Sequence, residues 1–138
     1  MTTNSNKNQI ITGWIISGFV ILFMLFDAVI KFLKPAEVIK TTVNELGYAE
    51  HHILIHGILA LTATLLYAIP RTSILGAIIL TGHFGGAIAS HLRVDNPIFS
   101  HTLFPVYVGI LMWLGLWLRN KRFRNIFPLT NISTNIDK

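Results

Sequence analysis

Four long apolar stretches, separated by short polar connections, dominate the hydrophobic pattern of this chain. Each approaches the roughly 20 residues that an α-helix needs to cross a bilayer. The pattern predicts membrane spans at about 10–33, 51–69, 73–91 and 102–118. A polar N-terminal segment (1–9) precedes this four-span domain (10–124), and a polar C-terminal tail (125–138) follows it. We therefore predict an all-α protein, a four-helix transmembrane bundle.

The connections predict how the spans are joined. Residues 70–72 form so short a link that the second and third spans must make an antiparallel hairpin. Between the first and second spans, Ile39, Val43 and Leu46 recur at helical spacing, with a proline ahead of them and a glycine behind. This segment predicts a short amphipathic interfacial helix, and a plain connector helix is the alternative.

Composition strengthens the membrane interpretation. Hydrophobic residues make up 52% of the 138 residues and charged residues only 12%, against about 25% charged in a typical soluble domain. This balance argues against a soluble enzyme, a disordered chain and a coiled coil. The net charge is +5, but the basic residues flank the apolar stretches, so we expect membrane lipid and no nucleic acid as a partner. The lack of cysteine excludes disulfides, thiolate catalysis and iron–sulfur clusters.

Basic residues also predict the orientation. Four spans place both termini on one side of the membrane, and that side carries more lysine and arginine than the other. Its basic residues are Lys7, Arg71, Arg119, Lys121, Arg122, Arg124 and Lys138. The other side carries Lys31, Lys34, Lys40 and Arg93. Positively charged flanks favour the cytoplasm. We expect a multi-pass protein of the cell membrane with both termini in the cytoplasm.

The ionisable residues of the spans share one half of the membrane. Counting helix rise, Asp27 lies roughly 10 Å, His56 roughly 8 Å and His83 roughly 12 Å from the extracytoplasmic end. The cytoplasmic half of every span is expected to be apolar. Because intramembrane charges are costly and mark functional sites, we predict a ligand pocket formed by Asp27, Lys31, His56, His83, His91, Arg93 and His101.

These residues also have structural explanations. Asp27 and Lys31 stand four apart on one helix face and can simply pair with each other. Either deep histidine is explained by a hydrogen bond between helices. The residues nearer the span end are explained as ordinary interface residues.

Gly82 and Gly86 form a pair of small residues in the third span. Such a pair lets helices approach closely. Packing within the chain, dimerisation, and room for a flat ligand beside His83 are all open.

An ordered set of short motifs resembles the DoxX-like membrane family. It runs over about residues 12–124 and comprises Thr12-Gly13-Trp14-Ile15, Leu25-Phe26-Asp27-Ala28-Val29-Ile30-Lys31, Leu46-Gly47-Tyr48, Leu66-Tyr67-Ala68-Ile69-Pro70-Arg71-Thr72, Leu75-Gly76-Ala77-Ile78, Gly85-Gly86-Ala87-Ile88-Ala89-Ser90-His91-Leu92-Arg93, Pro97, His101 and Leu103-Phe104-Pro105. The resemblance implies a compact four-helix membrane bundle without one settled activity. Relatives include a small subunit associated with an archaeal thiosulfate:quinone oxidoreductase. Many carry a glutamate where this chain has Ala60, and often a tyrosine where it has His83.

The leading functional hypothesis is a redox-linked subunit that binds a quinone or similar apolar ligand. His56 or His83 would donate a hydrogen bond to a carbonyl oxygen, and Asp27 would relay a proton. The alternative is a non-catalytic assembly subunit, as a homo-oligomer or beside a membrane redox partner. Haem or metal ligation through His56 and His83 is less favoured because no HxxxH or HExxH spacing occurs. A transporter is less favoured because no inverted repeat is evident.

Overall fold

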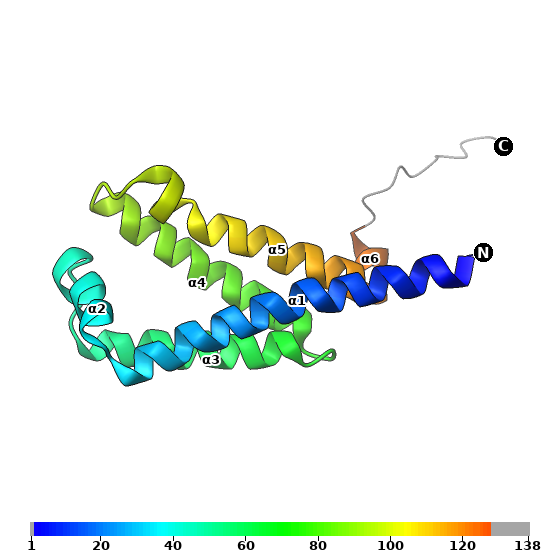
Figure 1. Cartoon of the computed structure of the whole chain (residues 1–138), viewed down its shortest axis with the longest axis horizontal. Helices are drawn as coiled ribbons and strands as arrows, with labels where there is room; N and C mark the ends of the chain where they lie inside the picture. Colours follow the sequence, from blue (N-terminus) through cyan, green and yellow to red (C-terminus); the bar gives the residue numbers. More distant parts are fainter. Residues whose placement is uncertain (1, 128–138) are drawn as a thin grey trace.

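The computed structural model describes residues 2–127, which form helices and turns without a strand (Figure 1). Four helical segments in this part are long and apolar enough to cross a bilayer: Asn6–Leu33, His51–Ala68, Ser73–Arg93 and Ile98–Arg119. They confirm the predicted all-α fold with four spans. Residues 128–138, which make up most of the predicted C-terminal tail, lie outside the described part.

The four long helices form a ring in which each packs mainly against two neighbours. α1 (Thr2–Leu33) and α4 (Ser73–Arg93) both pack against α3 (His51–Ala68) and α5 (Phe104–Arg119). The tight turn before Ser73 makes α3 and α4 the predicted antiparallel hairpin. In Figure 1 the short helix α2 (Ala36–Ile39) lies at one end of the bundle and α6 (Lys121–Ile126) at the other. We call these the α2 end and the α6 end.

Buried side chains from all four helices meet along the bundle axis. The largest include Met24 of α1, Tyr67 of α3, Leu80 of α4, and Met112 and Leu116 of α5. Lipid tails are as apolar as these side chains, so burial alone gives membrane helices little reason to associate. Close packing and hydrogen bonds between the helices therefore provide the driving force for their association.

A hydrogen-bond network joins three helices in the α6 half of the core. Tyr67 Oη donates to the Met112 carbonyl at 2.8 Å, so Ser17 Oγ donates to Tyr67 Oη at 3.0 Å. Gly115 permits this approach, because a Cβ there would lie 2.6 Å from Ser17 Oγ. The expectation of a wholly apolar cytoplasmic half is therefore wrong, since buried hydroxyl groups there bond to one another and to a carbonyl.

The predicted short helix between the first two spans is present. α2 continues directly into a wider π-helical turn, η1 (Lys40–Glu45), which ends where Gly47 adopts φ +72°. Leu46 is buried against the bundle, whereas Glu37 and Lys40 are exposed. The segment is thus amphipathic, as the spacing of its apolar residues predicts.

The ends of the spans differ from the sequence boundaries. α1 begins at Thr2, so residues 2–9 of the predicted polar segment belong to the first helix. The fourth span begins with a π-helical turn, η2 (Ile98–Thr102), ahead of the predicted start. α6 was not predicted; Asn120 caps it by accepting a hydrogen bond from the Phe123 backbone N–H at 3.1 Å.

Candidate functional site

A cavity of about 720 Å³ lies among the four spans at the α2 end. The spans form its walls, and the α2–η1 segment adds residues over its top. Most of the wall is apolar, with Phe23, Met24, Ile53 and Val108 among its residues. Against this background a small group of polar side chains stands out.

The cavity brings together most of the residues predicted for the ligand pocket: Asp27, Lys31, His56, His83 and His91. Gly82 and Gly86 line it as well. Arg93 and His101 do not belong to its lining. The structure thus gathers five of the seven predicted residues around one cavity and leaves the other two outside its lining.

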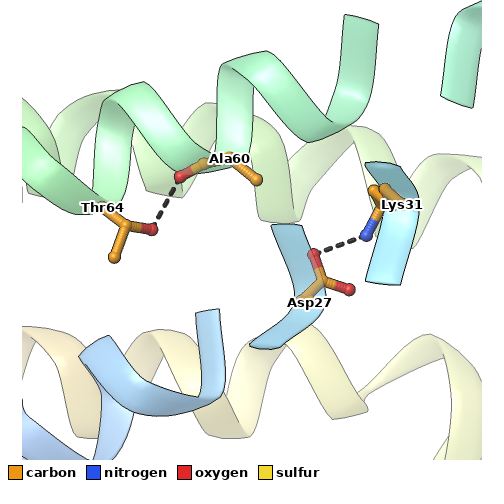
Figure 2. Close-up of polar contacts among 4 residues, drawn as sticks. All are labelled: Asp27, Lys31, Ala60 and Thr64. Carbon is orange, nitrogen blue, oxygen red and sulfur yellow. Dashed lines mark hydrogen bonds and ion pairs between the residues drawn. The ribbon is translucent and has the colours of Figure 1, made fainter. Parts of the chain in front are cut away.

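Asp27 and Lys31 form an ion pair on α1 (Figure 2). Lys31 Nζ lies 2.5 Å from Asp27 Oδ2, one helical turn away. The lysine side chain is 19% exposed and the aspartate side chain 30%, so the pair is partly withdrawn from solvent. Both side chains still line the cavity and can meet a ligand there.

Ala60 occupies the position where many relatives carry a glutamate. Its side chain is fully buried in the core and is not part of the cavity lining. Its carbonyl accepts a hydrogen bond from Thr64 Oγ1 at 2.6 Å, as Figure 2 shows. Among the described spans, Asp27 is therefore the carboxylate that reaches the cavity.

His56 of α3 and His83 of α4 face each other within the cavity lining. Their ring centroids are 6.1 Å apart, and the Tyr48 ring stands edge-on to His56 at 5.2 Å. Within the described residues, the hydrogen bonds made by histidine rings are those of His91 and His101. The deep histidines thus do not form the interhelical hydrogen bonds that would explain them structurally, and their ring nitrogens are free to bind a ligand.

Tyr48 and Ser90 are cavity residues that the sequence analysis missed. Ser90 Oγ donates to the Gly86 carbonyl at 2.8 Å, so the hydrogen bond between Tyr48 Oη and Ser90 Oγ, at 2.5 Å, is donated by the tyrosine. This bond ties the loop after η1 to α4. The signal in the sequence was slight: Ser90 stands one helical turn after Gly86, on the same face.

Arg93, His91 and His101 surround the mouth of the cavity. Arg93 donates from Nη2 to the Leu46 carbonyl and so fastens the end of η1. His91 Nδ1 accepts from Asn96 Nδ2 at 2.8 Å. His101 bonds to Ser100 at 2.8 Å, with its ring 5.9 Å from that of His91. Arg93 and His101 therefore support the rim and do not reach the cavity floor.

Three of the glycines of α4 face open space. A Cβ placed on Gly82, Gly85 or Gly86 meets no atom of the described chain within 4 Å. Neither Gly82 nor Gly86 therefore serves close packing within this chain. They leave room beside His83, and contact with a second copy stays a prediction.

The residues described include no group of three or more His, Asp or Glu side chains placed to hold a metal ion. The cavity is instead an apolar chamber with a few hydrogen-bonding groups at one depth. Chambers of this kind suit a mostly apolar ligand whose few polar atoms fix its orientation.

Comparison with protein families gives one match. The model described as the DoxX-like family matches residues 15–115, nearly the whole four-span domain. Comparison with curated proteins found no match, and neither did comparison with solved structures. Together with its four apolar spans, the match shows that this chain is an integral membrane protein of the DoxX-like family.

Proposed function

We propose that this protein binds a quinone, or a similar apolar ligand with a carbonyl head, in the cavity at the α2 end. The supporting observation is the pair of facing histidines, His56 and His83, whose ring nitrogens make no hydrogen bond to the described residues. In the predicted orientation this cavity belongs to the extracytoplasmic half of the membrane.

The residues present fit such a ligand. A cavity of about 720 Å³ lies within the range of roughly 300–1,000 Å³ typical of small-molecule sites. A quinone carbonyl only accepts hydrogen bonds, and the cavity offers histidine N–H groups and the Lys31 ammonium as donors. The aromatic and aliphatic walls suit a ring that favours an apolar environment.

The same proposal includes a redox partner. Quinone reduction takes up protons together with electrons. Asp27, His56 and His83 are groups of the spans that can hold a proton beside the head. The electrons would come from a membrane redox protein, which fits a small chain acting as a subunit.

Ligand binding by the purified, detergent-solubilised protein tests the proposal. Organic-solvent extracts are examined for co-purified quinone, and decylubiquinone is titrated into the stripped protein. We expect His56→Phe and His83→Phe each to weaken binding about five-fold or more, because each removes one hydrogen bond of about 1 kcal/mol. His51→Phe is the matched control, since His51 is exposed on α3 and does not line the cavity.

Absence of quinone in the extract together with no binding of decylubiquinone contradicts the proposal. Copurification of a partner from native membranes would then favour the non-catalytic assembly subunit. An absorption spectrum of the same sample tests the haem alternative, which requires a Soret band.

A further inference from the structure

A second hollow lies on the outside of the bundle, in the groove between α4 and α5. Its volume is about 660 Å³, and Gly85 and Ile88 on one helix face Gly109 and Ile110 on the other. Ile110 is 60% exposed, so this groove faces the bilayer. Its apolar walls suit a hydrocarbon chain.

The groove offers almost nothing to a polar group. Trp113 Nε1 donates to Thr81 Oγ1 at 2.9 Å, and Thr81 Oγ1 donates to the Ala77 carbonyl at 2.8 Å. These groove-lining polar groups thus satisfy one another. A polar head would lose its hydrogen bonds there, whereas in the cavity it meets donors.

The groove and the histidine cavity are neighbours. Phe84 of α4 and Pro105 of α5 line both spaces, so the two spaces adjoin at these side chains. α4 and α5 also contact each other less than the other neighbouring helix pairs do. Phe84 is 7% exposed, and a change of its rotamer is the side-chain movement that could join the two spaces.

We propose that the ligand is a long-tailed amphiphile, which places its carbonyl head beside His56 and His83 and its tail in the α4–α5 groove. This inference rests on the function proposed above and adds the class of ligand: a head with an isoprenoid or alkyl chain, which comes from the bilayer between α4 and α5. The open face of Gly85 leaves the path for the tail clear.

Two probes that share one head test this placement: decylubiquinone and the tail-less 2,3-dimethoxy-5-methyl-1,4-benzoquinone. Both are titrated at one fixed detergent concentration, so that partition into micelles is equal for all variants. We expect the unsubstituted protein to bind the long-tailed probe at least ten-fold more tightly than the tail-less probe. Gly85→Leu fills the groove and should remove this advantage while leaving the Kd of the tail-less probe unchanged.

Two further variants keep the test decisive. Gly18→Leu on α1 is the matched control, because Gly18 also has open space around it and lines neither hollow; it should change neither Kd. Ile110→Trp fills the groove from the opposite helix at an exposed position and should repeat the effect of Gly85→Leu.

The outcomes separate the two proposals. Equal affinity for both probes, or an advantage that survives Gly85→Leu and Ile110→Trp, overturns the tail placement and leaves the groove to bilayer lipid, while head binding stands. If neither probe binds, the proposed function itself fails, and the tail placement with it.

Discussion

Asp27 and Lys31 form a partly buried ion pair that also lines the cavity. Asp27→Asn keeps the shape of the side chain but leaves the Lys31 ammonium without its counter-charge. We expect a loss of about 1–3 kcal/mol in unfolding free energy, because the lysine side chain is only 19% exposed. Adding Lys31→Met should recover most of this loss. Unfolding in detergent, followed by circular dichroism, measures both.

The second ion pair of the described residues provides the control. Lys34 Nζ lies 3.4 Å from Glu50 Oε1, and the Glu50 side chain is 60% exposed. Glu50→Gln should therefore cost less than about 1 kcal/mol. If the double variant recovers stability but does not bind quinone, the Asp27–Lys31 pair contributes to quinone binding as well as to stability. If Asp27→Asn alone costs nothing, the pair is not a structural element.

At the residue scale, the level of a side chain along its helix could be predicted from the sequence, but the direction in which that side chain points could not. Helix rise placed His56 and His83 at one level, and the structure brings their rings together. Arg93 shares that level but turns toward the end of η1. The bond from Tyr48 to Ser90 joins positions 42 residues apart, and no local pattern in the sequence encodes such a contact.

At the scale of helices, we expect opposite effects on stability when each of two glycines of α4 is replaced by alanine. A Cβ on Gly76 would lie 2.6 Å from the Cα of Tyr67, in backbone that cannot move aside. Gly76→Ala should destabilise the protein by about 1–3 kcal/mol. Gly82→Ala meets open space and should be neutral, or stabilising by about 0.5–1 kcal/mol, because alanine favours the helix.

Thermal unfolding of the two variants in the same detergent checks this. A loss of stability in Gly82→Ala would show that its face is covered, as dimerisation through Gly82 and Gly86 requires. Size-exclusion chromatography with light scattering then decides whether a second copy covers it.

The elements themselves were largely predictable because a membrane span needs a long apolar run. The hydrophobic pattern did not predict α6 or the turn η2, and the reason is physical. α6 has six residues, too few to show a hydrophobic period, and packs Phe123 against Trp113 with ring centroids 5.3 Å apart. Its formation depends on tertiary contact. The turn η2 follows Pro97 and links α4 to α5 at the cavity end of the bundle, so its formation likewise depends on how these two helices pack.

Across the whole molecule, charge is divided between the two ends. Among residues 2–127, all charged side chains at the α6 end are basic. Every acidic residue of that part belongs to the α2 end: Asp27, Glu37, Glu45, Glu50 and Asp95. The excess of lysine and arginine at the α6 end favours the predicted orientation, with the α6 end in the cytoplasm. The cavity would then open away from the cytoplasm.

Cysteine labelling checks the orientation cleanly, because the chain has no cysteine of its own. Asn44→Cys on η1 and Lys121→Cys on α6 both replace exposed residues. A membrane-impermeant maleimide should label Asn44→Cys in intact cells, and Lys121→Cys only after permeabilisation. The reverse pattern would invert the orientation and leave the fold unaffected.

The layer formed by Ser17, Tyr67 and Met112 has a consequence for permeability. Four helices around ionisable residues resemble a channel, yet here the polar chamber stops at a level where these three residues are fully buried. There the Ser17 and Tyr67 hydroxyl groups bond to each other, and the tyrosine bonds to the Met112 carbonyl. Tight packing leaves no file of water to carry ions through it. We therefore expect that a proton that reaches Asp27 or His83 does not cross this layer, so the bundle should not conduct protons from one side of the membrane to the other.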